Sequence, residues 1–82
     1  MINNKIKSVL SLFGNTMTKY AEYMGMSKAS LSNKATRESW TAADLIQLAE
    51  LSDCKLAIIN KENRPIIIFD VEDIKKVPAS NE

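Results

Sequence analysis

Side chains that can form hydrogen bonds recur at helical spacing just after residue 27, and they define the chemistry available to this chain. The outward positions of a helix beginning there are Lys28, Ala29, Ser32, Asn33 and Thr36. A lysine ammonium can donate to the acceptors of guanine, and an asparagine amide can bond adenine through two atoms. Such a face suits the groove of a nucleic acid duplex, although a solvated helix surface has a similar composition.

The segment that must position these residues is MTKYAEYMGMSKASLSNKATR, residues 17–37, which predicts two short helices joined by a tight turn at Gly25. The small Ala21 allows the second helix to cross close over the first, and Gly25 takes a positive φ at little cost. Leu31 is expected to point back into the angle between the helices. This spacing predicts a helix-turn-helix unit.

Thr16 and Ser27 are the predicted N-caps of these two helices, because a hydroxyl can accept from the free backbone N–H groups of a first turn. The start of the first helix could also bind a phosphate of DNA. The predicted phosphate contacts are Thr18, Lys19, Lys34 and Arg37. The stem of Lys34 is expected to pack at the edge of the inner side while its ammonium reaches solvent or phosphate.

Length and composition limit the classes of fold and of site that the chain can have. A chain of 82 residues forms one domain with a modest core. One cysteine and no histidine leave no internal disulfide and no plausible zinc ligand set, and we expect no cofactor. No apolar run approaches the roughly 20 residues that span a membrane. The N-terminal segment is too polar for a signal peptide, so the expected location is the cytoplasm.

Charge is unevenly distributed along the chain. Residues 1–37 contain six basic residues and one acidic residue, a net charge of +5, whereas residues 38–82 contain five basic and nine acidic residues, a net charge of −4. This asymmetry is typical of a protein that turns one end toward phosphate and keeps the other away from it. Charges also scatter unevenly by chance in short chains.

Two further helices are predicted to brace the helix-turn-helix unit. A first helix should end at Gly14. Its apolar stripe consists of Ile2, Ile6, Val9, Leu10 and Phe13. Thr41 and Asp44 have the spacing of a capping box at the start of a fourth helix. Trp40 is expected to pack on Leu45 as a hydrophobic staple, and the alternative is that it stacks on a nucleic acid base.

After residue 53 the periodicity changes to that of strands. CKLAIIN and PIIIFDV predict a β-hairpin over residues 54–71, with Asn63 in the left-handed conformation. Both faces are apolar, so one should cover the helices and the other should pair with a second chain. The predicted dimer interface consists of Ile66, Ile67, Ile68 and Phe69. Cys54 is expected to be buried, and residues 72–82 to form a short turn and a loose tail.

The segment from about residue 5 to residue 53, and above all TMTKYAEYMGMSKASLS, resembles the Xre family of helix-turn-helix regulators, which includes phage Cro and lambda-type repressors. Ala21, Gly25 and Leu31 carry the resemblance, together with a following helix that ends near LAELS. The resemblance implies an α+β fold in which a four-helix, lambda-repressor-like bundle over residues 1–53 precedes a Cro-like hairpin. It further implies a dimeric repressor that reads an inverted repeat in double-stranded DNA.

The resemblance also implies which residues face the DNA. Base-facing or groove-facing positions would be Ser27, Lys28, Ala29, Ser32, Asn33 and Thr36. The chain departs from the family pattern at two places. Met17 stands where the family often has a glutamine that contacts phosphate, and Lys34 stands where it often has an apolar residue.

Two other classes of function remain. A protein-binding module, such as an antitoxin or an inhibitor of another protein, could use the helix-turn-helix unit or add a partner's strand to the hairpin edge. A phage or mobile-element protein of this size would fit either binding role. An enzyme is disfavoured, because the sequence has no histidine, no glycine-rich phosphate loop and no paired acids with a plausible pocket.

Overall fold

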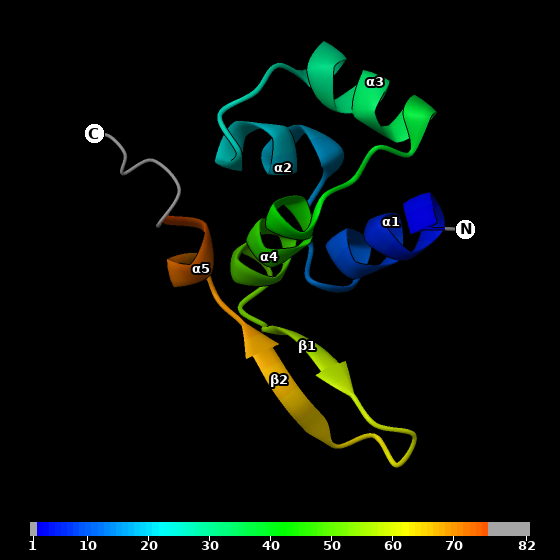
Figure 1. The fold of residues 1–82 in the computed structure, drawn as a ribbon. Coiled ribbons are helices and arrows are strands. Elements are labelled where there is room, and N and C mark those ends of the chain that lie inside the picture. Colours follow the sequence, from blue (N-terminus) through cyan, green and yellow to red (C-terminus); the bar gives the residue numbers. More distant parts are fainter. Residues whose placement is uncertain (1, 76–82) are drawn as a thin grey trace.

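A computed structural model of the chain describes residues 2–75 and has an α+β fold. Within these residues, helices form one body, and a two-stranded antiparallel hairpin extends from it (Figure 1). The elements are α1 (Ile2–Leu12), α2 (Met17–Tyr23), α3 (Lys28–Arg37), α4 (Ala42–Leu51), β1 (Leu56–Ile59), β2 (Pro65–Phe69) and α5 (Val71–Lys75). Most of the predicted tail lies outside the described residues.

The helix boundaries follow the predicted capping residues. The Thr16 hydroxyl accepts from the Lys19 backbone N–H at 3.1 Å, and Thr41 and Asp44 form both bonds of a capping box. Gly25 has a φ of 72°, as the turn between α2 and α3 requires. Each of these predictions is confirmed. Helix α3 runs one residue further than expected, because the following Glu38 adopts a left-handed conformation that satisfies the last carbonyls.

The hydrophobic core lies where α1, α2, α3 and α4 meet. It consists of Ile6, Leu10, Tyr20, Ala21, Leu31 and Leu48. The predicted apolar stripe of α1 is therefore only partly correct, because Phe13 remains 48% exposed and Ile2 is also exposed. The apolar arc of α1 is wider than the surface that the neighbouring helices cover. Its uncovered edge faces the start of the hairpin.

Tyr20 is the largest fully buried side chain of this core. Its ring stacks on Trp40 with the ring centroids 6.1 Å apart, and its hydroxyl donates to the backbone carbonyl of Asp44 at 2.6 Å. Burial, and secondarily the negative charge of Asp44, raise the pKa of Tyr20 above its ordinary value. The Tyr20 hydroxyl therefore keeps its proton to a higher pH in the folded chain than in the unfolded chain.

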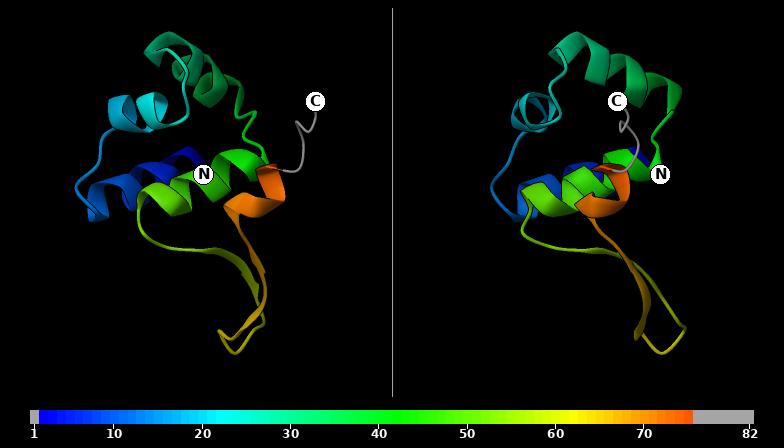
Figure 2. Two further views of the ribbon diagram at one scale, coloured as in Figure 1. Left: turned by 90° about the vertical axis from the view of Figure 1, so that its left-hand side faces the viewer. Right: turned by 60° about the vertical axis from the view of Figure 1, so that its left-hand side comes forward.

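The hairpin does not cover the helices, which corrects the expectation that one of its faces would do so. Its five isoleucines, at positions 58, 59, 66, 67 and 68, are between 52% and 60% exposed. The hairpin leaves the body at the base of α4 and points away from it in all the views of Figures 1 and 2. Helix α5 packs on α4, and β1 also contacts α4.

The chain turns sharply into the hairpin, and an ion pair joins the roots of its two strands. Asp53 has a φ of 58°, and the Lys55 ammonium lies 3.0 Å from the Asp70 carboxylate. Cys54 is exposed at this turn, so the prediction that it is buried was wrong. At the other end of the hairpin Asn63 has a φ of 68°, as predicted. Among the described residues, no helix is long and apolar enough to cross a membrane.

The raised pKa of Tyr20 predicts a loss of stability in alkaline solution. Its contribution is complete below the ordinary tyrosine pKa of about 10 and declines as the pH rises above that value. We expect the free energy of unfolding to fall as the pH rises above about 10. The Tyr20→Phe variant should lack the part of this fall that comes from Tyr20. At pH 7 its free energy of unfolding should be lower by about 1 kcal/mol, because the hydrogen bond to the Asp44 carbonyl is lost.

The measurement is urea unfolding followed by circular dichroism at several pH values. Tyr23→Phe is the matched control, because Tyr23 is exposed. An alkaline decline of equal size in Tyr20→Phe and the unaltered chain would contradict the assignment.

Candidate functional site

Helix α3 presents a polar surface at the end of the molecule opposite the hairpin (Figure 1). Every residue of its predicted groove-facing set is exposed: Ser27, Lys28, Ala29, Ser32, Asn33 and Thr36. We call this set the α3 face. Because α3 holds itself to the body through Leu31, which is buried, the opposite side of the helix is left open to solvent. The α3 face can therefore meet a flat or grooved partner without any rearrangement of the core.

Ser27 differs from the rest of the α3 face, because its hydroxyl already has partners within the chain. It accepts from the Ser30 backbone N–H at 3.1 Å and lies 3.0 Å from the Ser30 hydroxyl. Its predicted role as an N-cap is confirmed. The free hydrogen-bonding groups of the face are then those of Lys28, Ser32, Asn33 and Thr36, none of which has a side-chain hydrogen bond within the described residues.

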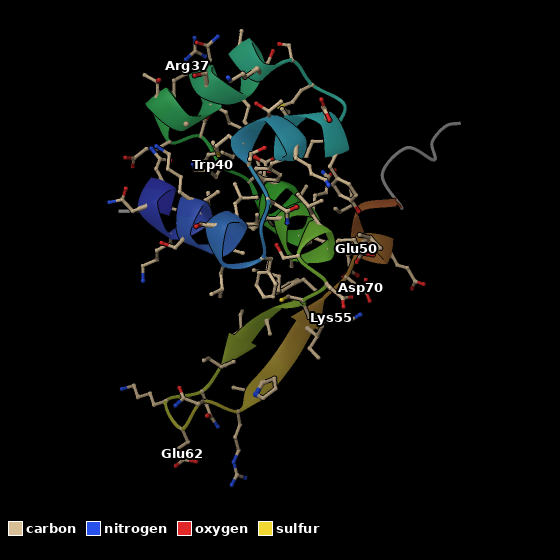
Figure 3. The ribbon with its side chains drawn as sticks, turned by 180° about the vertical axis from the view of Figure 1, so that it is seen from behind. Arg37, Trp40, Glu50, Lys55, Glu62 and Asp70 are labelled. Carbon is tan, nitrogen blue, oxygen red and sulfur yellow. The ribbon has the colours of Figure 1, made fainter. Side chains whose placement is uncertain are left out.

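The residues predicted to contact phosphate differ in their exposure. Thr18, Lys19 and Arg37 are exposed, and Figure 3 shows Arg37 at the outer edge of α3. Lys34 instead places its ammonium 2.9 Å from the Asp44 carboxylate, and the side chains of Lys34 and Asp44 are only 22% and 8% exposed. This ion pair corrects the prediction that Lys34 reaches solvent or phosphate. A carboxylate already fixed by its capping box attracts a nearby cation strongly where water is largely excluded.

Asn3 ties α1 to the C-terminal end of α3, a contact that the sequence analysis missed. Its amide nitrogen donates to the Ala35 carbonyl at 2.9 Å, and its amide oxygen accepts from the Trp40 indole N–H at 2.7 Å. One side chain thus joins three segments of the chain. A signal was present in the sequence: Asn3 precedes Ile6 by three residues and so lies on the apolar stripe of α1, where a polar side chain needs an internal partner.

Trp40 is half-buried and packs against the core. It lies against the core, as Leu45 does, and its indole stacks on Tyr20 while donating to Asn3. These contacts account for the residue through packing and favour that interpretation over stacking on a nucleic acid base, while the staple contact with Leu45 stays a prediction. Helix α3 is therefore held at two places, to α4 through Lys34 and Asp44 and to α1 through Asn3, which also holds Trp40 of the α3–α4 connection.

Cations are in slight excess among the exposed charged residues of α2 and α3. The exposed cations of these two helices are Lys19, Lys28 and Arg37. Exposed Glu22 and Glu38 accompany these cations, and the hairpin and α5 carry both signs of charge; Figure 3 shows Glu62 at the hairpin tip and Asp70 at its root, far from Arg37. The excess of positive charge around the α3 face is therefore small, and it favours a polyanion as partner.

A second surface of the molecule is apolar. A groove of about 380 Å³ lies between α1, α4 and the start of β1, and we call it the α1–α4 groove. Its lining includes Ile2, Val9, Phe13, Leu45 and Leu56, and the stems of Lys5 and Lys55 complete it. It lacks the converging polar groups that fix a small molecule in its site. The groove therefore suits apolar side chains of another segment or chain.

Comparison of the chain with models of known protein families, with curated proteins and with solved structures gives no match.

The Asn3 tie predicts a specific loss of stability. Asn3→Ala removes two hydrogen bonds and leaves the half-buried indole N–H of Trp40 without its partner, which should cost about 1 to 3 kcal/mol in the free energy of unfolding. Urea unfolding measures this cost, and Trp40 fluorescence reports on the indole surroundings. Asn4→Ala is the matched control, because Asn4 is exposed on the same helix. Equal stabilities of the two variants would contradict a role for the tie.

Proposed function

We propose that this chain is a sequence-specific DNA-binding regulator, with α1 to α4 in a lambda-repressor-like arrangement and α3 in the major groove. The observation that carries the proposal is the α3 face: a helix held firmly from behind, whose open side carries donors and acceptors that read base edges. Regulation follows from occupancy of a DNA site, as in a Cro-like repressor. In this proposal the chain binds DNA and catalyses no reaction.

Each part of the α3 face has a role in this proposal. Lys28 donates to guanine and Asn33 bonds adenine, while Ser32 and Thr36 contact bases or nearby phosphates. Lys19 and Arg37 neutralise phosphates on either side, with Thr18 donating to the backbone. Lys34 is left out of this set because its ammonium is held by Asp44.

The chain acts as a dimer in this proposal, because the hairpin carries apolar surface that water does not favour. Burying an isoleucine side chain completely contributes about 1.5 to 3 kcal/mol, so five side chains that are half exposed leave roughly 4 to 7 kcal/mol per chain unrealised. A dimer would place two α3 helices in successive major grooves, roughly 34 Å apart, on a short inverted repeat.

Fluorescence anisotropy with DNA from upstream of the chain's own gene tests the proposal. The purified chain is titrated at several salt concentrations, beside a scrambled duplex of the same composition. Tight binding that prefers the native fragment and weakens steeply with salt is expected. No preference for the native fragment, or no binding at moderate salt, would overturn the proposal that the chain is a sequence-specific regulator.

A protein-binding module is the second candidate, and the exposed hairpin favours it. An antitoxin or an inhibitor could bury the isoleucines of β2 against its target and use the strand edge for pairing. Salt separates the two functions. Binding to DNA weakens steeply as salt rises, whereas an apolar strand interface does not.

Asn33→Ala should cost about 1 to 3 kcal/mol in binding to the preferred DNA site and relax the choice of base at one position. The reason is that the amide reads an adenine edge through two hydrogen bonds. Anisotropy on a set of duplexes, each with one base pair changed, measures both effects. Equal weakening on every duplex would refute the assignment of Asn33 to a base edge.

Arg37 and Lys34 should differ in their effect on salt dependence. Arg37→Ala should reduce the slope of log affinity against log salt by about one, because it removes one phosphate contact. Lys34→Met should leave that slope unchanged and lower the free energy of unfolding by about 1 to 3 kcal/mol, because it breaks the ion pair with Asp44. Anisotropy gives the slopes and urea unfolding gives the stabilities. A reduced slope in Lys34→Met would show that Lys34 does reach phosphate.

A further inference from the structure

The two ends of α3 are held to the body by different contacts. At the N-terminal end the short turn from α2 fixes the helix, because Met26 packs against the core and its backbone N–H donates to the Ala21 carbonyl at 3.0 Å. Leu31 is buried near the middle of the helix. At the C-terminal end two side-chain hydrogen bonds hold the helix, one made by Asn3 of α1 and one by Lys34 of α3 itself.

Of these two hydrogen bonds, the one made by Asn3 fixes the backbone of α3 more closely. The ammonium of Lys34 lies at the end of a flexible four-carbon stem, so the helix can shift while the ion pair with Asp44 persists. Asn3 has a short side chain that donates directly to the Ala35 backbone carbonyl at 2.9 Å. Figure 1 shows the C-terminal end of α3 on the same side of the molecule as the start of α1. Loss of the Asn3 donor therefore frees this end of α3 while the turn still holds the other.

The partners of Asn3 leave one arrangement of its amide. The indole N–H of Trp40 can only donate and the backbone carbonyl of Ala35 can only accept, so the amide oxygen faces Trp40 and the amide nitrogen faces Ala35. Trp40 in turn stacks on Tyr20, which is fully buried. Asn3 therefore connects the centre of the core to the last turn of α3.

The α3 face is divided in the same way as the contacts behind it. Lys28 lies in the first turn of the helix, next to the turn from α2, whereas Asn33 and Thr36 flank Ala35 in the second half. A hydrogen bond to a base edge needs a donor–acceptor distance of about 2.7 to 3.2 Å, so a displacement of about 1 Å breaks it. Reading of bases by Asn33 and Thr36 thus depends on the Asn3 amide, and reading by Lys28 does not.

We propose that Asn3 is a positioning residue for DNA recognition. By holding the Ala35 carbonyl it fixes Asn33 and Thr36 against their base pairs, and it so determines the choice of base at those positions. The inference rests on the proposed function and deepens it, because it assigns part of the sequence specificity to a side chain of α1 that acts through the backbone of α3.

A residue that only stabilises the fold would have a different effect on binding. Partial unfolding lowers the concentration of binding-competent protein, so it weakens binding to every duplex by the same factor. The ratio of affinities between two duplexes then stays unchanged. A positioning residue changes that ratio, and it does so only at the base pairs that the displaced side chains read.

Asn3→Asp isolates the positioning role. Its carboxylate still accepts from Trp40, but it has no proton to donate to Ala35 and it opposes the negative end of the α3 dipole. Asn3→Ala removes the donor without adding charge and is measured beside it, so the test stands if the carboxylate prevents folding. Asn4→Asp is the matched control, because it adds the same charge at an exposed position of the same helix. Circular dichroism checks the fold of each variant.

Anisotropy on duplexes that differ from the preferred site at one base pair measures the discrimination at each position. Alanine variants of Lys28, Asn33 and Thr36 first identify the position that each residue reads. Asn3→Asp and Asn3→Ala should lose about fivefold or more of the discrimination at the positions of Asn33 and Thr36. They should keep the discrimination at the position of Lys28 within about twofold, and Asn4→Asp should keep it at every position.

Backbone amide signals in nuclear magnetic resonance spectra report the same displacement without DNA. In both Asn3 variants the signals of Arg37 and Ser39, at the C-terminal end of α3, should move further from their wild-type positions than the signal of Ser30 in the first turn. In Asn4→Asp all three signals should stay in place. Changes of equal size at both ends of α3 would overturn the positioning role.

Failure of the inference and failure of the proposed function are distinct in these measurements. Ratios of affinity that stay unchanged in the Asn3 variants, or that fall equally at every position, would overturn the positioning role and leave the regulator standing. A wild-type chain that prefers no duplex would overturn the proposed function, and the inference with it.

Discussion

The rest of the helical body depends on the interactions of Asp44 at the start of α4. Its carboxylate caps α4 and accepts from the Lys34 ammonium of α3, while its backbone carbonyl accepts from the Tyr20 hydroxyl of α2. Three helices therefore meet at one residue. A core of this size buries few side chains. Polar contacts between helices therefore do more to fix the positions of the helices than they would in a larger domain.

These contacts explain why one side of α3 is free for a partner. Lys34 and the Ala35 carbonyl face inward and are occupied by Asp44 and Asn3, so the orientation of α3 is set entirely from behind. Apart from Ser27, which caps α3, the side chains of the α3 face make no hydrogen bond that holds the helix to the body. A helix that must present its donors in a fixed register to a groove benefits from such a division, because ordering the helix then costs no binding free energy.

The apolar surface of this chain is distributed in an unusual way. The longest apolar run, in β2, lies outside the core, and the α1–α4 groove beside the hairpin root is also uncovered. Exposure of either surface to water is unfavourable for a chain on its own. The apolar surface of the hairpin and the polar α3 face therefore lie at opposite ends of the molecule.

The sequence by itself determined the local structure: the caps at Thr16 and Thr41, the turn at Gly25 and the two strands of the hairpin. Each depends on residues within a few positions of one another, so size, spacing and capping chemistry suffice. Only the tertiary structure decided that Lys34 turns to Asp44, that Asn3 joins α3 to Trp40, and that the hairpin leaves the body uncovered. These outcomes depend on which surfaces meet across distant parts of the chain, and periodicity carries no information about that choice.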